Sequence, residues 1–332
     1  MSLLELVDLH TYFRTKRGVV KAVNGVSYRV EAGKTLGVVG ESGSGKSVSA
    51  MSILRLLDGN GYIHSGKILF EGRDLTKIPM NEMYAIRGNE ISVIFQEPMT
   101  SLNPVFTIQR QLQEVYRTHQ RVSKKAAEEK AVQSLQDVRI PNPETVLRQY
   151  PHQLSGGMRQ RIMIAMALAC EPRVLIADEP TTALDVTIQA QILNLMRDLQ
   201  TQRGTAILFI THDLGVIREM ADSVAVMYCG EVVEMAPVAK IFGDRVISHP
   251  YTEGLLESIP RLDKEPGVRL EAIPGSVPHP LNLPKGCKFA PRCKFATPFC
   301  REQEPALEEV APAHSIRCLY PDTEKRRKEI ET

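Results

Sequence analysis

The chain has 332 residues, of which 43% are apolar, and its 41 basic and 39 acidic side chains nearly cancel. A chain of this size can bury one large hydrophobic core or two smaller ones. The balanced charge excludes a strong overall field that would draw the protein onto nucleic acid. The short basic run at residues 325–328 indicates a solvated tail and not a binding patch.

The apolar runs of the chain predict no secretory signal and no membrane span. The first ten residues lack the basic start and the apolar run of a signal peptide. The longest apolar run, at residues 162–170, is far shorter than the ~18–20 residues that span a bilayer. We therefore expect a soluble cytosolic protein that reaches a membrane only through a partner.

The predicted elements begin with a small antiparallel sheet and continue as alternating strands and helices. Alternating apolar residues at 20–30 and 66–72 predict the antiparallel sheet. Helical stretches are predicted from residue 46 to about 57 and over residues 186–203. Short apolar runs predict buried strands at 34–40, 91–95, 174–178, 206–210 and 223–228. This alternation favours a parallel sheet covered by helices.

Two segments depart from this alternation. Between residues 104 and 165 the strand-like runs give way to charged helical sequence, which predicts a helical subdomain inserted into the sheet domain. After residue 258, prolines interrupt a stretch with little periodicity, which predicts an extended linker that leads into the tail. We place a boundary near Pro260, so that residues 1–259 form one domain and residues 260–332 a C-terminal extension.

The sequence GESGSGKS at residues 40–47 has the spacing of a phosphate-binding loop. Its glycines let backbone N–H groups curl around phosphate oxygens, and the helix that follows adds the positive charge of its N-terminal end. Lys46 would neutralise the β- and γ-phosphates, and Ser47 would hold Mg²⁺. A glycine-rich turn is the alternative, but the loop lies between a predicted strand and a predicted helix, which favours the phosphate loop.

The sequence RVLIADEP ends a predicted buried strand with two acids. Asp178 would lie at the C-terminal edge of that strand, where open α/β sheets bind ligands, and would complete the Mg²⁺ site. Glu179 beside it could orient or deprotonate an attacking water. A polar cap on a strand end would explain one acid, but it explains the whole set poorly.

The sequence LSGGM at residues 154–158 precedes a helical run and is a second candidate anion cradle. Ser155 would also suit a plain helix N-cap, so the residues alone leave both roles open. They do not explain why one domain would need two phosphate cradles.

Together and in this order, the motifs resemble the ATP-binding cassettes of ABC transporters, over roughly residues 1–240. In that family the phosphate loop of one subunit faces the signature loop of another, with ATP between them, which accounts for the two cradles. The resemblance implies an α/β fold of the ABC-type P-loop ATPase class, with a parallel core sheet, a small antiparallel β subdomain and an inserted helical subdomain. An irregular, cysteine-bearing C-terminal extension would follow.

The resemblance also implies the roles of single residues. Catalysis would depend on Glu179, on the switch histidine His212 and on the Q-loop glutamine Gln96. Mg²⁺ would be held by Ser47, Gln96 and Asp178. ATP would be contacted by Phe13, Gly40, Ser42, Gly43, Ser44, Gly45, Lys46, Ser47, Gln96 and Asp178. The ATP bound mainly by a partner would be contacted by Ser155, Gly156, Gly157 and the D-loop residue Asp185.

Three of these residues could have ordinary structural roles when each is taken alone. Phe13 could be a core residue, His212 a structural histidine and Gln96 an ordinary loop amide. Their order and spacing within the family pattern favour the functional roles.

The segments FQEPMTSLNP and HPYTEGLLESIP, the proline-rich stretch and the terminal cysteines are similar to the oligopeptide/dipeptide permease branch, and to its D-type subunit. This resemblance implies an ATPase motor that drives the import of di- or oligopeptides. The implied partners are a second, F-type ATPase subunit, two transmembrane permease subunits and, indirectly, a peptide-binding protein, with no nucleic acid. The protein would be peripheral, on the cytoplasmic face of a bacterial or archaeal cell membrane.

Other functions stay open at this point. Nickel-import ATPases share much of the pattern. A soluble cassette ATPase that acts on nucleic acid or ribosomes usually has two cassettes, a long coiled-coil insertion or basic arms, and the sequence has none of these. A non-enzymatic regulatory subunit is disfavoured because Glu179 and His212 are intact.

Four of the six cysteines gather in the tail, at Cys287, Cys293, Cys300 and Cys318. Disulfides are disfavoured in a reducing cytosol. Structural zinc sites usually contain a tight C-x₂₋₄-C turn, whereas the gaps here are five, six and seventeen residues; zinc stays an alternative. Four thiolates are typical ligands of Fe–S clusters. The permease resemblance implies one [4Fe–4S] cluster with a structural role.

Overall fold

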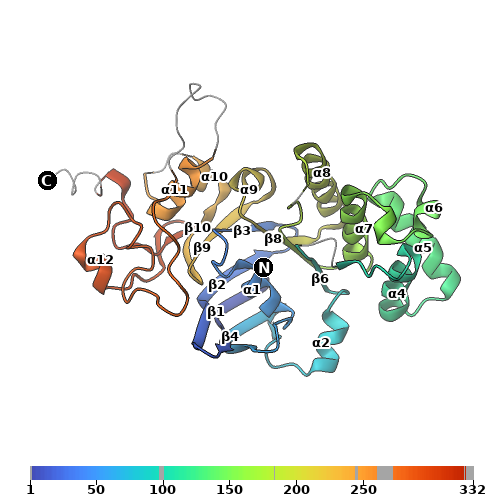
Figure 1. Cartoon of the computed structure of the whole chain (residues 1–332), viewed down its shortest axis with the longest axis horizontal. Coiled ribbons are helices and arrows are strands. Elements are labelled where there is room, and N and C mark those ends of the chain that lie inside the picture. The colour runs from blue at the N-terminus through green and yellow to red at the C-terminus, as the bar shows by residue number, and fades with distance from the viewer. Residues whose placement is uncertain are drawn as a thin grey trace. The chain divides into compact units, whose positions relative to one another are not determined.

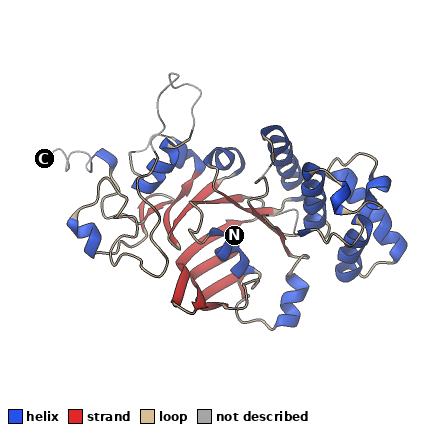
Figure 2. Ribbon diagram, in the orientation of Figure 1, coloured by secondary structure: helices blue, strands red, loops and turns tan. Residues whose placement is uncertain are grey.

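The computed structural model describes residues 2–96, 101–182, 184–243, 246–259 and 272–324, together with Arg326. The chain forms two compact units that alternate along the sequence. The helical unit comprises Met1–Leu4, Val30–Lys34 and Lys77–Ile210. The phosphate-loop unit comprises Glu5–Arg29, Thr35–Thr76 and Thr211–Thr332. Figures 1 and 2 show the helices and strands of the chain.

The helical unit contains the parallel strands β6 (Ile91–Ile94), β7 (Val174–Asp178) and β8 (Ala206–Thr211), which belong to an eight-stranded sheet. Their first residues align, with Ile91 beside Val174 and Val174 beside Ala206. Every residue of β7 and β8 is buried, as expected for apolar runs in a parallel sheet. The strands predicted in this region are confirmed.

The helices of the helical unit lie mostly in the segment between β6 and β7, where Figure 1 shows α4 to α7 gathered together. Four helices are capped by a side chain that accepts a hydrogen bond from the backbone N–H three residues further on; the caps are Thr107, Ser123, Ser155 and Asp185. The helices are α2 (Met80–Ile86), α4 (Ile108–Gln120), α5 (Lys124–Asp137), α6 (Pro143–Leu147), the 3₁₀ turn η1 (Pro151–Gln153), α7 (Gly156–Leu168) and α8 (Val186–Arg203). The predicted inserted helices are therefore present.

The phosphate-loop unit contains a four-stranded sheet in the order β2–β1–β4–β5, drawn as red arrows in Figure 2. Its strands are β1 (Ser2–Thr15), β2 (Gly18–Glu31), β4 (Gly61–Phe70) and β5 (Arg73–Asp74). β4 and β5 pair antiparallel, with Leu69 opposite Asp74. This sheet occupies the region where the sequence predicts a small antiparallel sheet.

The same unit has further strands that continue into the C-terminal extension. β3 (Thr35–Val39) runs parallel to β9 (Ser223–Tyr228), and β10 (Glu231–Pro237) follows antiparallel to β9. β12 (His314–Ile316) pairs with β10, and β11 (Glu308–Ala311) pairs with β12, both antiparallel. The helices of this unit are α1 (Lys46–Ile53), α9 (Leu214–Met220), α10 (Val238–Phe242), α11 (Pro250–Glu257) and α12 (Pro298–Glu302).

Two expectations about local structure need correction. The helix predicted to reach residue 57 ends at Ile53, because Arg55 adopts a left-handed backbone with φ of 53°. The extension, predicted to have little strand structure, contributes β11 and β12, whose hydrogen bonds continue the sheet beyond β10. The predicted boundary at Pro260 falls outside the described residues.

Over the described part of the chain, no helix combines the length and the apolar character needed to cross a membrane.

Candidate functional site

The phosphate loop follows β3 and needs glycine at two close approaches. Gly40 and Gly45 have φ angles of 153° and 96°, in the region that glycine alone adopts readily. A Cβ atom at Gly40 would lie 2.2 Å from the carbonyl oxygen of Met227, and one at Gly45 would lie 2.3 Å from that of Ala22. Any larger residue at either position would push the loop away from its neighbours.

Lys46 is buried at the start of α1, and oxygens of the loop hold its ammonium group. Nζ lies 2.7 Å from the carbonyl oxygen of Gly40, 3.0 Å from that of Glu41 and 3.5 Å from Oγ of Ser44. Ser47 follows in the first turn of α1 and is half-buried. The loop thus gathers an ammonium group, hydroxyl groups and a helix N-terminal end, which are the groups that bind phosphates.

Two further predicted ATP contacts of the loop, the predicted switch histidine and the predicted adenine-stacking residue all have solvent-accessible surface. Ser42 and Gly43 are exposed at the tip of the loop, and His212 is exposed after β8. Phe13 on β1 is half-buried, and its ring lies against Gly61, where a Cβ atom would be 2.7 Å from a ring carbon. Adenine stacking by Phe13 stays a prediction.

The helical unit contains the two predicted acids. Asp178 is the last residue of β7 and is only 5% exposed. Glu179 has a left-handed backbone with φ of 47°, and its N–H donates to the carbonyl oxygen of Ile210 on β8. Both acids therefore lie at the carboxyl end of β7, beside the end of the parallel strand β8, where open α/β sheets bind ligands.

Two side chains orient the carboxylate of Glu179. Its Oε2 accepts a hydrogen bond from Nε2 of Gln96 at 3.0 Å and another from Oγ1 of Thr182 at 2.9 Å. The structure thus brings together Gln96 and Glu179, which the sequence assigns to one catalytic centre. Thr182 is not among the residues predicted from the sequence, although a hydroxyl three residues after an acid is a signal that could have pointed to it.

The signature segment forms the start of α7. Ser155 is exposed, and its hydroxyl accepts from the backbone N–H of Met158 at 3.3 Å, so it is an N-cap whatever else it binds. Gly156 and Gly157 form the first turn, and a Cβ atom at Gly157 would lie 3.0 Å from Ile188. Exposed Asp185 caps α8 in the same way through Ile188. The neighbouring Ala183 of the predicted D-loop lies outside the described residues.

The four tail cysteines line one pocket, together with Phe289 and Arg326. Burial raises the pKa of Cys293 to about 12 and that of Cys318 to about 11, and it also raises the pKa of Cys287. The backbone N–H of Cys287 donates to the carbonyl oxygen of Cys300, which joins two of the cysteine segments. The structure therefore gathers residues that the sequence spreads over more than thirty positions.

Within residues 325–328, which the sequence predicts to be a solvated tail, Arg326 is buried, and the other three residues lie outside the described residues. Nη2 of Arg326 forms an ion pair with the buried carboxylate of Glu253 on α11. Nε and Nη1 are also buried, and neither has a hydrogen-bond partner among the described residues. Arg326 is therefore a second candidate residue, beside the cysteine pocket, that was not predicted from the sequence.

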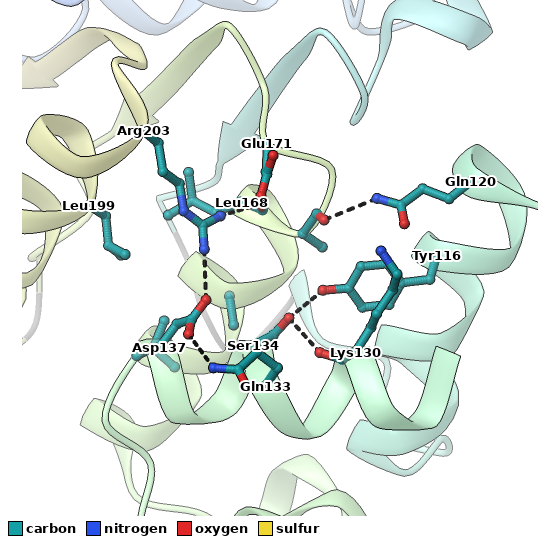
Figure 3. Close-up of a pocket in the computed structure, with 13 residues that line it drawn as sticks. Tyr116, Gln120, Lys130, Gln133, Ser134, Asp137, Leu168, Glu171, Leu199 and Arg203 are labelled. Carbon is teal, nitrogen blue, oxygen red and sulfur yellow. Dashed lines mark hydrogen bonds and ion pairs between the residues drawn. The ribbon is translucent and has the colours of Figure 1, made fainter. Parts of the chain in front are cut away.

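A separate cavity of about 210 Å³ lies in the helical unit, among α4, α5, α7 and α8 (Figure 3). Arg203 donates to Asp137 at 2.7 Å and to the carbonyl oxygen of Leu168 at 2.9 Å. Tyr116 and Ser134 are hydrogen-bonded to each other. These polar groups satisfy one another, and the motif residues do not line the cavity, so it is a packing feature of the helices.

Two family models match the chain. One, described as ABC transporter, matches residues 23–182, and one described as the C-terminal region of oligopeptide/dipeptide transporters matches residues 233–300. Curated relatives match nearly the full length. The chain is 53% identical over 324 residues to the oligopeptide transport ATP-binding protein AppD of Bacillus subtilis, covering 97% of this chain and 98% of that protein.

A further relative and a solved structure are also similar to the chain. The chain is 48% identical over 319 residues to the oligopeptide transport ATP-binding protein OppD of Salmonella typhimurium, covering 96% of this chain and 94% of that protein. Among solved structures it resembles the dimeric ATP-binding cassette MJ0796 bound to ADP and Pi, with a TM-score of 0.64 and 25% identity. That match covers 71% of this chain and 98% of the other.

Proposed function

The chain belongs to the family of ABC transporter ATP-binding proteins, and from that membership we propose that it is the ATP-hydrolysing motor of a peptide importer. The observation that carries the proposal is the extent of the similarity. It reaches 53% identity over 97% of the chain, so it includes the C-terminal extension as well as the cassette. A cassette ATPase that acts on nucleic acid or ribosomes would leave the extension unexplained.

ATP and Mg²⁺ are bound and ATP is hydrolysed by the predicted site residues. Lys46 and the backbone of residues 40–47 bind the phosphates, and Ser47, Gln96 and Asp178 supply oxygen ligands of the kind that Mg²⁺ prefers. Glu179 orients and deprotonates the attacking water. The hydrogen bonds from Gln96 and Thr182 to its carboxylate support this role, because phosphoryl transfer depends mainly on positioning and electrostatics.

Phe13 and His212 complete the proposed contacts to this nucleotide. Phe13 stacks on the adenine, and its half-buried ring leaves a surface for that contact. His212 contacts the γ-phosphate, which its exposed position after β8 permits.

The signature residues act on the nucleotide of a partner ATPase. Ser155 and Asp185 are exposed, as residues that reach across to a partner must be. The partner we propose is a second, F-type ATPase subunit, and both stand on two transmembrane subunits that a peptide-binding protein supplies. The protein is then peripheral, on the cytoplasmic face of the membrane. The mass of the purified complex separates this arrangement from one that contains two copies of this chain.

Peptide uptake in cells tests the transport proposal. Cells that lack the gene should lose accumulation of a labelled di- or oligopeptide, and a plasmid-borne copy should restore it, whereas a copy with Lys46→Ala should not. Nickel accumulation should not change. Loss of nickel uptake with normal peptide uptake would instead assign the chain to nickel import.

We further propose that Cys287, Cys293, Cys300 and Cys318 hold a [4Fe–4S] cluster. Among the described residues, no three His, Cys, Asp or Glu side chains are placed to hold a single metal ion, yet the four cysteines surround one pocket. A cluster takes one thiolate at each corner and so suits ligands that are more widely spread. The pocket is narrow, at about 20 Å³, so the thiol side chains must turn outward to admit it.

Buried charge in the pocket supports an anionic occupant. Nε and Nη1 of Arg326 are buried without an acceptor in the described part of the chain, and cluster sulfurs or thiolates would provide acceptors. The raised pKa of Cys293 and of Cys318 keeps these thiols protonated until a metal displaces the protons. When bound, the cluster would crosslink a segment that has little apolar core of its own.

Metal analysis of anaerobically purified protein tests this assignment. Iron and acid-labile sulfide should each be near four per chain, with a brown colour. Colourless protein with one zinc and no sulfide would refute the cluster.

A further inference from the structure

One acid of the phosphate loop is tied to the C-terminal extension. Glu41 follows Gly40, and its carboxylate accepts two hydrogen bonds from Arg292, one from Nη1 at 2.5 Å and one from Nη2 at 3.0 Å. Its carbonyl oxygen accepts from Nζ of Lys46 at 3.0 Å. Its N–H donates to Oη of Tyr251 on α11 at 2.8 Å. Glu41 therefore connects the phosphate-binding lysine to the extension.

Arg292 is fixed by its surroundings on several sides. Nε donates to the carbonyl oxygen of Pro274 at 2.9 Å, and Nη1 lies 3.4 Å from Oη of Tyr228. The residue is only 6% exposed. A buried guanidinium group with this many partners has one orientation, so it can hold the carboxylate of Glu41 in one place.

The segment between the first two cysteines delivers Arg292 to the loop. Within it, Phe289 packs against Tyr228 and Tyr251, with ring centroids 5.3 and 5.4 Å apart. The backbone N–H groups of Arg292 and Cys293 both donate to the carbonyl oxygen of Phe289. An aromatic anchor and a tight turn therefore set the position of Arg292 beside the cysteine pocket.

We propose that Arg292 is a positioning residue for ATP: it neutralises Glu41 and fixes the phosphate loop in the form that accepts the triphosphate. The inference rests on the proposed function, because it takes the loop to be the ATP site. Without Arg292, an unpaired carboxylate would stand within the loop that must receive an anion, and would repel it. The carbonyl oxygen of Glu41, which accepts a hydrogen bond from Lys46, would also be held less firmly.

This role predicts a defect that depends on the charge of the nucleotide. Arg292→Met keeps most of the buried length of the side chain and removes the charge. In the full-length chain, purified without oxygen, it should weaken Mg-ATP binding about tenfold and ADP binding less, since ADP brings less negative charge to the loop. Arg292→Lys should bind ATP more tightly than Arg292→Met, because it retains the positive charge.

A second substitution separates positioning from mere support of the fold. Adding Glu41→Gln to Arg292→Met removes the repelling carboxylate and should return ATP affinity to within about threefold of the parent. Arg317→Ala is the matched control: Arg317 also joins the extension to the sheet, through the carbonyl oxygen of Val232 and the carboxylate of Glu231, but does not contact Glu41. It should lower the melting temperature and leave ATP affinity unchanged.

Two results would overturn the inference. One is a lower melting temperature for Arg292→Met with parental ATP affinity. The other is an equal loss of ATP and ADP binding that Glu41→Gln does not relieve. If Arg292→Met fails to fold, the comparison of Arg292→Lys with its Glu41→Gln double variant decides in the same way. Failure of the parent protein to bind Mg-ATP would refute the proposed function itself.

Discussion

Glu179 combines an unusual backbone conformation with a tightly held carboxylate. Few residues other than glycine adopt a positive φ, and Glu179 has a φ of 47°. Such a conformation persists when surrounding contacts determine it, here a backbone hydrogen bond to Ile210 and side-chain hydrogen bonds from Gln96 and Thr182. The carboxylate is thus oriented before any water arrives, which suits a general base.

Glu179→Gln should separate binding from hydrolysis. Glutamine has the same shape but cannot accept a proton, so ATP affinity should stay within about twofold while turnover in the assembled complex falls at least a hundredfold. Nucleotide binding and phosphate release measure the two effects. Glu171→Gln is a matched control, because Glu171 is exposed in the same unit and also has a positive φ. Parental turnover in Glu179→Gln would remove Glu179 from the chemistry.

The sequence motifs predict the candidate site residues of the cassette, but they do not point to three further residues that depend on distant or directional contacts. Thr182 acts through the direction of its hydroxyl, which follows from the backbone turn at Glu179. Arg292 meets Glu41 across 251 positions, and no local pattern reveals such a pair. Arg326 lies in a run of charges that reads as solvated, yet Glu253 pairs with it in the interior. Motif spacing predicts site residues that lie close together in the sequence. Residues that reach the site only through tertiary folding cannot be predicted in this way.

The helices and strands that could be predicted from the sequence are the longer ones and those with clear start and end signals. The helix predicted over residues 186–203 has those bounds, because Asp185 caps its start and Gly204 ends it with a left-handed backbone of φ 66°. The parallel strands were predicted because each is a buried apolar run. β11 and β12 are four and three residues long, too short for a recognisable pattern, and they are paired through tertiary contacts, β12 with β10 and β11 with β12.

The position of Arg326 in the extension predicts how it would affect the reduction potential of the proposed cluster. Arg326 lines the cysteine pocket with a positive charge and with N–H donors that have no acceptor among the described residues, and both would stabilise the more negative, reduced form of a bound cluster. Arg326→Gln should therefore shift the midpoint potential to more negative values in an EPR-monitored redox titration. Glu253→Gln removes the opposite charge of the same ion pair and should not shift it in that direction. A midpoint unchanged by Arg326→Gln would contradict this role for Arg326.

At the level of the assembled transporter, Ser155 tests the shared nucleotide site. Ser155→Asp keeps a good N-cap for α7, so the melting temperature should barely change. The added carboxylate would face the phosphates bound by the partner, so ATP turnover of the pair should fall about tenfold or more, while ATP binding by this chain is spared. Ser123→Asp is the control, because Ser123 is also an exposed N-cap, on α5. Normal turnover with Ser155→Asp would argue against a sandwich that uses this residue.

ATP hydrolysis by the complete importer in lipid vesicles, measured with and without a peptide-loaded binding protein, is the most direct test of an ATP-driven peptide importer. The chain should be purified with its membrane subunits and partner ATPase. We predict that the loaded binding protein increases hydrolysis several-fold and that labelled peptide enters the vesicles, and that Glu179→Gln in this chain abolishes both. An ATP hydrolysis rate that is the same with and without the loaded binding protein, together with no peptide uptake, would contradict the proposed function.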